Sequence, residues 1–261
     1  MKVILSPAKN IVPHPMPGLP LTRPRFLAQT ETLCAQLKNS SPWQLESLLS
    51  VNPELALRAY QDFQQFSPEL PGTAALLSYH GLQYQQLDAG SLSLEELAFA
   101  QECLRPLSAF YGVLRPCDGI LPHRLEFFSR LRLDGKTLYQ FWGDLFYQDL
   151  FSHGEPVVNL ASAEYAKAVF PHLRPGDRFI CCDFLVFRKG KRCTVATWAK
   201  MARGQLARWI VKNQAEQPEQ LKEFCWQGFT FIPSLSSDTH YVFLLVPDSS
   251  AEIGVNDGKR K

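Results

Sequence analysis

The sequence predicts an α/β fold of the mixed α+β kind, in which flanking helices cover one central mixed sheet. Three observations lead to this prediction. Short apolar runs of strand length recur along the chain, capped helix starts stand between them, and the two kinds of segment do not alternate strictly. Strict alternation would favour an all-parallel sheet instead. We expect a single domain over residues 1–247, and a disordered tail over the polar, glycine-containing residues 248–261.

The N-terminal half is expected to begin with a strand and continue with helices. Residues 2–5 (KVIL) form the first strand, and residues 11–25, which hold five prolines, form an extended connection. Helices should begin directly after Ser41, Asn52 and Ser93. The first two are followed by proline, and the first and third have Gln or Glu three residues later, which completes a capping box.

The C-terminal half contains more strands. An Asp-Gly pair at 134–135 predicts a hairpin between residues 131–133 and 137–141. The remaining expected segments are a strand at 156–161, a hairpin of 179–187 and 193–198 around the basic tip RKGKR, an amphipathic helix at 202–213, and closing strands at 227–232 and 241–246.

Composition limits the class of protein. Hydrophobic residues make up 46% of the chain and charged residues 20%, which is typical of a globular protein. The net charge is +2, so any contact with nucleic acid would come from a local patch. The sequence predicts no signal peptide and no membrane span. The seven cysteines form no CxxC pair, and we expect them to be reduced in a cytoplasmic protein.

Residues 104–126 (LRPLSAFYGVLRPCDGILPHRLE) concentrate charged side chains among glycines, prolines and aromatics. This mixture predicts an ordered, functional surface that is built on turns. Arg115 and Arg124 can clamp a phosphate or a carboxylate, and Glu126 can orient Arg124 or act as an acid or base. The alternative is a structural network of arginines and carboxylates that holds an irregular segment in place.

Three expected strands end in polar residues, and ligands of open α/β sheets bind at the carboxyl ends of strands. If the three strands are neighbours with the same direction, Lys9, Asp144, Asn159 and Ser162 converge. The alternative is that these residues are ordinary caps and turns. The polar residues at these strand ends are Ser6, Lys9, Asp144, Asn159, Ser162, Glu164 and Tyr165.

Several familiar motifs are incomplete. Ser6 and Lys9 match S-x-x-K, but the S-D-N and K-T-G elements of penicillin-recognising enzymes are missing, so Lys9 is better explained as an anion contact, a base or a nucleophile. Gly135-Lys136-Thr137 lacks the first P-loop glycine, whose position is Arg130. No metal-ligand spacing is present, and we predict neither a metal site nor a cofactor.

Basic residues of the C-terminal half offer a second kind of site. The tip at 188–192 and the helix residues Lys200, Arg203, Arg208 and Lys212 can contact a nucleic-acid backbone. The alternative is a solvated turn and helix face.

Seven segments together resemble the YaaA family of bacterial peroxide-stress-resistance proteins. They are SPAK at 6–9, LSAFYGVLRPCD at 107–118, RLE at 124–126, LYQFWGD at 138–144, NLASAEY at 159–165, AKMARG at 199–204 and QPEQL at 217–221. The resemblance implies a cytoplasmic α/β protein with a positively charged cleft and a helix-hairpin-helix-like element. It also implies DNA binding and a role in limiting damage by free iron under peroxide stress.

One segment departs from the family pattern. Where members typically read FKGDVY, this chain reads YHGLQY at 79–84, so His80 replaces a lysine and Leu82 an aspartate. If the segment lines the cleft, the ligand differs. The alternative function is therefore an enzyme that acts on a small anionic or nucleotide-like substrate, with Arg115 and Arg124 as the anion clamp. Its acid-base or nucleophilic candidates are Lys9, Glu126 and Asp144, and its ligand contacts are Ser6, Asn159, Ser162, Glu164, Tyr165, Lys200 and Arg203.

Overall fold

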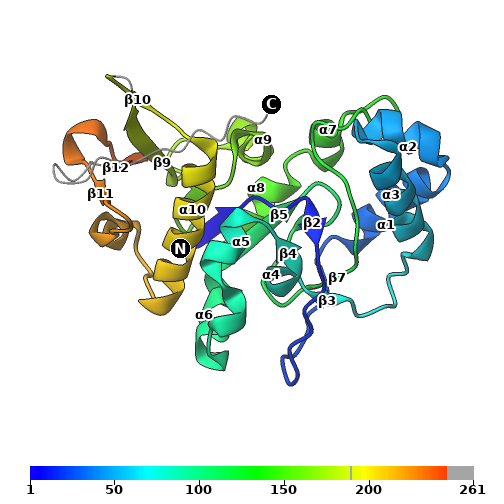
Figure 1. Cartoon of the computed structure of the whole chain (residues 1–261), viewed down its shortest axis with the longest axis horizontal. Coiled ribbons are helices and arrows are strands. Elements are labelled where there is room, and N and C mark those ends of the chain that lie inside the picture. Colours follow the sequence, from blue (N-terminus) through cyan, green and yellow to red (C-terminus); the bar gives the residue numbers. More distant parts are fainter. Residues whose placement is uncertain (189, 246–261) are drawn as a thin grey trace, which may run out of the picture.

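One sheet forms the centre of the computed structural model, which describes residues 1–188 and 190–245 (Figure 1). The expected tail at 248–261 lies outside the described residues. Within them the sheet has eight strands in the order β11-β12-β9-β8-β1-β5-β6, and β10 pairs with β9. The strands are β1 (Lys2–Leu5), β5 (Leu104–Ser108), β6 (Gly112–Val113), β8 (Val157–Leu160), β9 (Phe179–Arg188), β10 (Lys191–Cys193), β11 (Phe229–Phe231) and β12 (His240–Leu245).

The sheet is mixed, as the sequence predicts, with a parallel centre. Neighbours from β5 through β1, β8 and β9 to β12 are parallel, whereas β6, β10 and β11 pair antiparallel. The chain leaves β1 toward β5 on one side and leaves β8 toward β9 on the other. The crevice between β1 and β8 is therefore a topological switch point, the place where open α/β sheets bind ligands.

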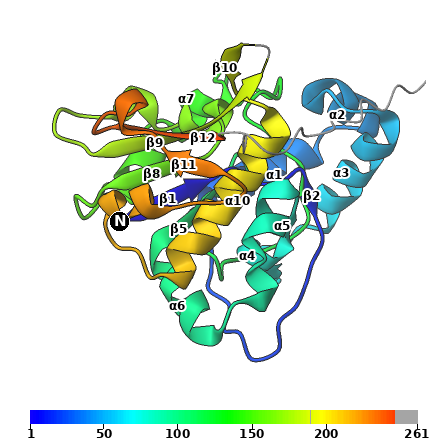
Figure 2. The same cartoon turned by 60° about the vertical axis from the view of Figure 1, so that its left-hand side comes forward.

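Helices cover the sheet unevenly. In Figures 1 and 2, α5, α6 and α10 lie together on one face, and α1, α2 and α3 gather at one end of the molecule. The helices are α1 (Leu27–Lys38), α2 (Pro42–Leu49), α3 (Pro53–Gln65), α4 (Ala75–Ser78), α5 (Leu82–Leu87), α6 (Leu94–Cys103), α7 (Leu138–Trp142), α8 (Leu145–Leu150), α9 (Ala163–Ala166) and α10 (Ala196–Lys212). The described residues also contain four 3₁₀ turns, η1 to η4, at Ala89–Ser91, Phe170–His172, Pro218–Glu223 and Pro233–Leu235.

Two small strand pairs complete the described structure. They are β2 (Asn10–Ile11) with β4 (Tyr79–His80), and β3 (Thr73–Ala74) with β7 (Gly119–Ile120). No helix among the described residues is long and apolar enough to span a membrane.

The helix starts in the N-terminal half are confirmed. Ser41 and Ser93 each form a complete capping box, with Gln44 and Glu96 respectively. The Asn52 side chain accepts a hydrogen bond from the amide of Leu55. These caps satisfy amide groups that the first helical turn leaves without a partner.

The predicted strand at 137–141 is wrong, because this segment is helix α7. The Asp-Gly turn is present, with Asp134 and Gly135 both at positive φ and a single bridge between Leu133 and Lys136. Thr137 then forms a capping box with Gln140 and starts a helix. The local capping signal decides the structure here, and the hairpin stops at its turn.

The strand predicted at 193–198 is also wrong in most of its length. β10 ends at Cys193, and α10 begins at Ala196, before the expected start at 202. The earlier start adds a turn to α10 that carries Lys200 toward the carboxyl ends of the strands.

Residues 104–114 do not form part of the turn-built surface that we expected over 104–126. All five residues of β5 are buried, and burial continues through Leu114. Arg105 is only 8% exposed, and its guanidinium donates to the carbonyl oxygens of Gln101 and Leu104. Backbone carbonyl oxygens thus satisfy the guanidinium of Arg105, a charged residue that the sequence alone would place on the surface.

Candidate functional site

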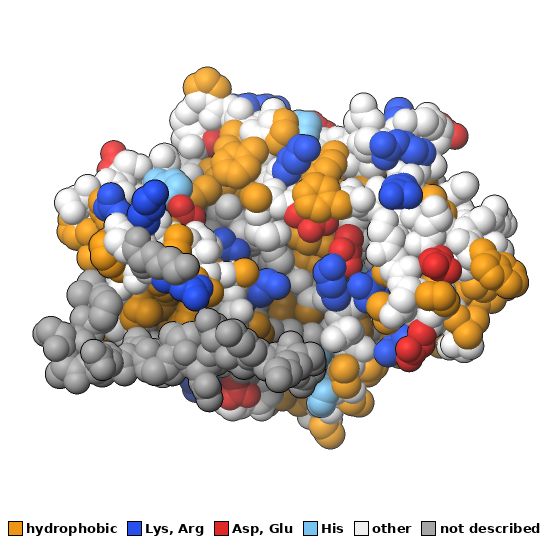
Figure 3. All heavy atoms as spheres, turned by 45° about the horizontal axis from the view of Figure 1, so that its top comes forward, with side chains coloured by type: hydrophobic (Ala, Val, Ile, Leu, Met, Phe, Trp, Pro, Cys, Tyr) orange, Lys and Arg blue, Asp and Glu red, His pale blue; other side chains and the backbone are white. Residues whose placement is uncertain are grey.

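A pocket opens at the carboxyl ends of β1 and β5 and just beyond β8, at the switch point of the sheet. Its volume is about 460 Å³, and its walls come from the segment after β1, the start of α5, the segment 123–126, the start of α9, and α10. Figure 3 shows a hollow in this face of the molecule, with Lys or Arg and Asp or Glu side chains around it. Small-molecule sites in proteins have volumes of about 300–1,000 Å³.

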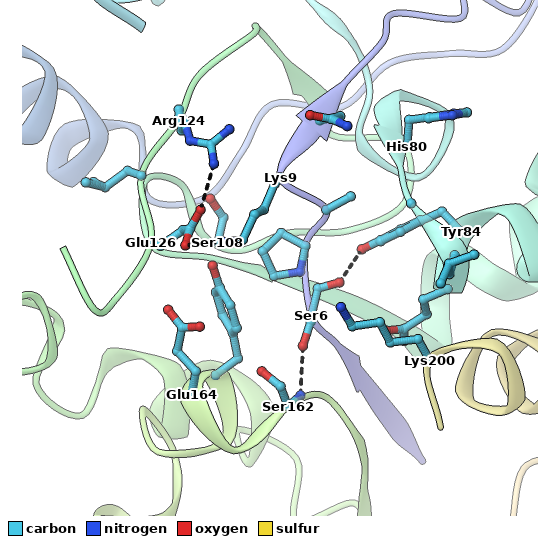
Figure 4. Close-up of a pocket in the computed structure, with 18 of the residues that line it drawn as sticks. Ser6, Lys9, His80, Tyr84, Ser108, Arg124, Glu126, Ser162, Glu164 and Lys200 are labelled. Carbon is cyan, nitrogen blue, oxygen red and sulfur yellow. Dashed lines mark hydrogen bonds and ion pairs between the residues drawn. The ribbon is translucent and has the colours of Figure 1, made fainter. Parts of the chain in front are cut away.

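Ser6 connects three walls of the pocket (Figure 4). Its Oγ accepts a 2.7 Å hydrogen bond from the amide of Ser162, and its carbonyl oxygen accepts a 2.8 Å hydrogen bond from the Tyr84 hydroxyl. Tyr84 is 6% exposed, so this contact is protected from water. Ser6 therefore serves as a positioning residue at the end of β1.

Lys9, Glu126 and Arg124 form a chain of ion pairs on one side of the pocket. One Glu126 oxygen lies 3.1 Å from Lys9 Nζ, and the other lies 3.5 Å from an Arg124 Nη atom. The Lys9 side chain is 67% exposed, whereas that of Arg124 is 16% exposed. The two cations therefore share one carboxylate, and the less exposed Arg124 depends on it more strongly than Lys9 does.

α10 brings Lys200 and Arg203 to the pocket. These residues are three apart and so share a helix face. Neither has a carboxylate within 4.0 Å among the described residues. Arg203 Nε is buried and donates to no hydrogen-bond acceptor in that part of the chain. Burial lowers the pKa of Arg203, and the charge of Asp183 opposes this shift.

Glu164 and Tyr165 begin α9 and face the same pocket. Burial raises the pKa of Glu164, and the charge of Glu126 adds to the rise. The amide of Phe128 donates to Glu164 Oε1 at 3.3 Å and acts in the opposite direction. Burial also raises the pKa of Tyr165 well above its usual value, so its hydroxyl keeps its proton.

Ser108 and His123 line the pocket, although sequence reasoning missed both. His123 Nδ1 donates to the Leu121 carbonyl oxygen at 2.9 Å, which leaves Nε2 as an acceptor 3.4 Å from Ser108 Oγ. Burial lowers the pKa of His123 to about 4, so the ring is neutral at pH 7. The position of Ser108 at the carboxyl end of β5 is the signal that would have found it.

The Ser108–His123 contact is a structural feature of the turn. Ser108 is 1% exposed, and its Oγ already accepts hydrogen bonds from the amides of Phe110 and Tyr111. A nucleophilic serine needs access to its substrate, which this hydroxyl lacks.

The predicted site residues fall into two groups. The pocket brings together Ser6, Lys9, Arg124, Glu126, Ser162, Glu164, Tyr165, Lys200 and Arg203. The expected convergence of strand ends thus includes Lys9 and Ser162. It does not include Arg115, Asp144 or Asn159, which do not line this pocket.

Each of the three outlying residues has a structural setting of its own. The guanidinium of Arg115 pairs with buried Asp118 at 3.2 Å. Asp144 is the N-cap residue of α8, because the strand expected before it is helix α7. Asn159 accepts from the amide of Ala161, and its Nδ2 lies 3.5 Å from Cys181 Sγ.

Residues 80–84, within the segment that departs from the family pattern, line the pocket. His80, Leu82 and Tyr84 are among the lining residues. The rim therefore carries an imidazole and an isobutyl group at the two positions where the resemblance implies lysine and aspartate.

The remaining basic residues of α10 make structural contacts. Arg208 donates to the carbonyl oxygens of Leu87 and Asp88, and Lys212 pairs with Glu96 at 2.8 Å. All seven cysteines are free. Within residues 1–188 and 190–245, no three His, Cys, Asp or Glu residues are grouped so that they could hold a metal ion.

Comparison with known proteins identifies the relatives of this chain. A family model described as "Peroxide stress protein YaaA" matches residues 1–235. A "UPF0246 protein" of Limosilactobacillus fermentum is 40% identical over 245 residues, which cover 94% of this chain and 99% of that protein. A "UPF0246 protein" of Ligilactobacillus salivarius is 38% identical over 246 residues, with the same coverage of 94% and 99%. One from Agathobacter rectalis is 34% identical over 244 residues, which cover 93% and 98%.

Proposed function

Because this chain belongs to the YaaA family of peroxide stress proteins, we propose that it acts in the peroxide stress response of the cytoplasm by binding a small anionic ligand in its pocket. The observation that favours an anion most strongly is the setting of Arg203. Its buried Nε has no partner among the described residues, and it lines the pocket. A desolvated guanidinium without a counterion is costly, and a bound anion would remove this cost.

Charge balance favours the same conclusion. The pocket is lined by four cationic side chains (Lys9, Arg124, Lys200 and Arg203) and two carboxylates (Glu126 and Glu164). His123 adds no positive charge at pH 7, because burial lowers its pKa to about 4. This excess of positive charge attracts anions into a concave site with low-dielectric walls.

A more specific form of this proposal is that the pocket is the active site of an enzyme. Lys9 and Glu126 are in contact and both line the pocket, so they are its candidates for proton transfer. Asp144 is not among its lining residues and drops out of the catalytic set. The anion clamp that we first assigned to Arg115 and Arg124 passes to Lys200 and Arg203, because Arg115 is paired with Asp118.

The test is the binding of inorganic phosphate, measured by isothermal titration calorimetry. Arg203→Met keeps an unbranched side chain but removes the guanidinium and its charge, and we expect it to weaken phosphate binding at least about tenfold, the loss of one charge-assisted contact. Lys212→Ala removes a charge from the same helix away from the pocket and should leave the affinity unchanged. Equal affinities of the wild type and Arg203→Met would contradict the proposal.

DNA binding is the second candidate function. It is favoured by the exposed basic residues Arg188, Arg192 and Lys200, and by α2 and α3, which the short turn 50–52 joins into a helical hairpin. Mobility-shift titrations with duplex DNA should show binding that weakens steeply with salt, because phosphate contacts release counterions. Arg188→Ala with Arg192→Ala should reduce both the affinity and its salt dependence. The absence of a shift at low salt would exclude this function.

Protection from iron-dependent damage is the cellular consequence that we propose. A strain that lacks the protein should be more sensitive to hydrogen peroxide and should contain more free iron by electron paramagnetic resonance. Wild-type protein should restore both properties, and Arg203→Met should restore neither. Rescue by Arg203→Met would separate the stress role from the anion pocket.

A further inference from the structure

The pocket is divided into two parts of unequal charge. In Figure 4, Glu126 and Glu164 lie on one side of the cavity and Lys200 lies on the opposite side. The first part contains Lys9, Arg124, Glu126 and Glu164, whose formal charges cancel. The second part contains Lys200 and Arg203, which have no carboxylate within 4.0 Å among the described residues. The excess of positive charge therefore belongs to the α10 side alone.

The α10 side suits a doubly charged anion. Lys200 contributes a flexible ammonium and Arg203 a planar guanidinium, and both donate hydrogen bonds without accepting any. A phosphate monoester has a charge of about −1.5 to −2 at pH 7 and several acceptor oxygens. The charge of a phosphate monoester therefore balances Lys200 and Arg203 better than the single charge of a carboxylate ligand does.

The opposite side suits a neutral group that donates hydrogen bonds. Glu164 has no cation within 4.0 Å in the described part of the chain, and the Phe128 amide occupies only one side of one of its oxygens. Its carboxyl group thus keeps acceptor positions that face the cavity. An ammonium group would gain little here, because Lys9 and Arg124 already balance the two carboxylates.

We infer that the ligand of this pocket is a ribose phosphate, either free or as part of a nucleotide. This inference rests on the proposed function, in which the pocket binds an anion. The phosphate monoester lies at Lys200 and Arg203, and sugar hydroxyls donate to Glu164. A carboxylate that accepts from ribose hydroxyls is also how dinucleotide sites at sheet switch points hold the sugar.

The size and lining of the cavity agree with such a ligand. A volume of about 460 Å³ exceeds what a phosphate ion needs. Pro7, Ala8 and Leu125 contribute apolar surface, against which a sugar ring or a base can pack. The apolar contacts and the polar groups at the two ends together define one orientation of the ligand.

The experiment compares the affinities of four probes by isothermal titration calorimetry at fixed pH and salt. The probes are ribose 5-phosphate, adenosine 5′-monophosphate, 2′,3′-dideoxyadenosine 5′-monophosphate and adenosine, and inorganic phosphate is measured beside them as the reference. The wild type should bind the dideoxynucleotide and adenosine each at least about tenfold more weakly than adenosine 5′-monophosphate, since each loses hydrogen bonds to a charged group. If the ligand is a free sugar phosphate, ribose 5-phosphate should bind at least as tightly as adenosine 5′-monophosphate.

Two variants test which residue holds the phosphate end and which holds the ribose end of the ligand. Glu164→Gln should reduce the preference for the ribonucleotide over the dideoxynucleotide at least threefold and leave the preference for the phosphate intact. Lys200→Ala should reduce the preference for adenosine 5′-monophosphate over adenosine and leave the preference for the ribonucleotide over the dideoxynucleotide intact. Glu95→Gln, on the exposed face of α6, is the matched control for Glu164→Gln and should change neither preference.

The outcomes separate this inference from the proposed function. If no phosphorylated probe binds, both are overturned. If inorganic phosphate and both nucleotides bind with equal affinity, or if Glu164→Gln retains the full preference for the ribonucleotide, the pocket binds anions but does not recognise ribose, and this inference alone is overturned.

Discussion

Glu126 is the residue on which the charge of the pocket depends most. It pairs with both Lys9 and Arg124, and together with Glu164 it balances their charge, so only two of the four cations in the pocket lack a balancing carboxylate. The sequence placed Glu126 beside Arg124 because they are two residues apart, but the contact with Lys9 joins residues that are far apart in the chain.

Glu126→Gln should therefore strengthen anion binding. Removing one negative charge from the pocket should raise the affinity for inorganic phosphate about two- to fivefold, which corresponds to about 0.5–1 kcal/mol for charges several ångströms apart in a medium of high dielectric constant. The measurement is the phosphate dissociation constant at low salt. Weaker binding by a variant that is still folded would show that Glu126 itself helps to hold the anion.

His123 should make the stability of the fold depend on pH. Its pKa is lowered to about 4 by burial, against about 6.5 in the unfolded chain. At pH values above 6.5 both states are neutral and the histidine costs nothing. As the pH falls from 6.5 toward 4, the unfolded chain takes up a proton that the folded protein does not, and the free energy of unfolding should fall by about 3 kcal/mol.

The measurement is urea unfolding of the wild type and of His123→Gln between pH 7 and pH 4. Glutamine keeps hydrogen-bonding groups near Ser108 and Leu121 but does not titrate. The variant is expected to be less stable at pH 7, because it loses the stacking of His123 on Phe110, and its stability should decline less toward pH 4. Parallel curves for both proteins would rule out the assignment to His123.

At the scale of elements, the packing of α10 against α5 sets the position of the anion-binding side chains. Gly204 allows this close approach, because a Cβ atom there would lie 2.1 Å from the backbone oxygen of Gln83. Gln83 is itself 7% exposed and donates to the Leu160 carbonyl oxygen at 3.3 Å. Gly204 thus links α10 to α5 and to the end of β8.

Gly204→Ala should push α10 away from α5. An alanine in a helix is normally favourable, but this Cβ meets backbone, and we expect a loss of about 1–3 kcal/mol in the free energy of unfolding. Phosphate binding should weaken as well, since Lys200 and Arg203 move with the helix. Gly90→Ala, where a Cβ meets nothing within 4 Å, is the control and should leave phosphate affinity unchanged. A Gly204→Ala protein as stable as the wild type would refute this role of Gly204.

The local signals at each helix explain which helices could be predicted from the sequence. The starts of α2, α3 and α6 were predictable because their caps lie within three residues of the groups that they satisfy. α7 was mistaken for a strand because an Asp-Gly turn and a capping box overlap at residues 134–140, and the turn was given more weight. Asp144 was misplaced with it, since its assignment to a strand end depended on that strand.

The site could be predicted only where chain position gave a signal. Ser6, Lys9 and Ser162 lie within four residues of the ends of β1 and β8, so the strand-end rule found them. Lys200 and Arg203 were predicted as ligand contacts from the resemblance to the family, because no local pattern indicates that α10 crosses to the ends of β1 and β8. The burial of residues 104–114 likewise depends on tertiary contacts that the polar composition of this segment hides.

At the scale of the whole molecule, β1 joins the two halves of the chain. It lies between β5 and β8 and pairs with both in parallel register. The helical region around α1 to α6 therefore shares its sheet with β8, β9 and β12. This arrangement predicts that the described chain unfolds as one cooperative unit.

Leu33→Ala tests this cooperativity. Leu33 is fully buried in α1, and its truncation should cost about 2–5 kcal/mol. Variants that retain only Trp142, in α7, or only Trp209, in α10, report on different parts of the molecule. Leu33→Ala should shift the urea midpoint equally for both reporters. A shift for Trp142 alone would indicate two independent units.

The central claim is that the pocket holds an anion between Lys200 and Arg203, at the switch point of the sheet. The most direct test is a crystal structure of the protein soaked with ribose 5-phosphate. We expect phosphate oxygens within hydrogen-bond distance of Lys200 and Arg203, and sugar hydroxyls toward Glu164. A phosphate bound instead to Lys9 and Arg124, with Glu126 displaced, or a pocket that stays free of ligand at saturating concentration, would contradict it.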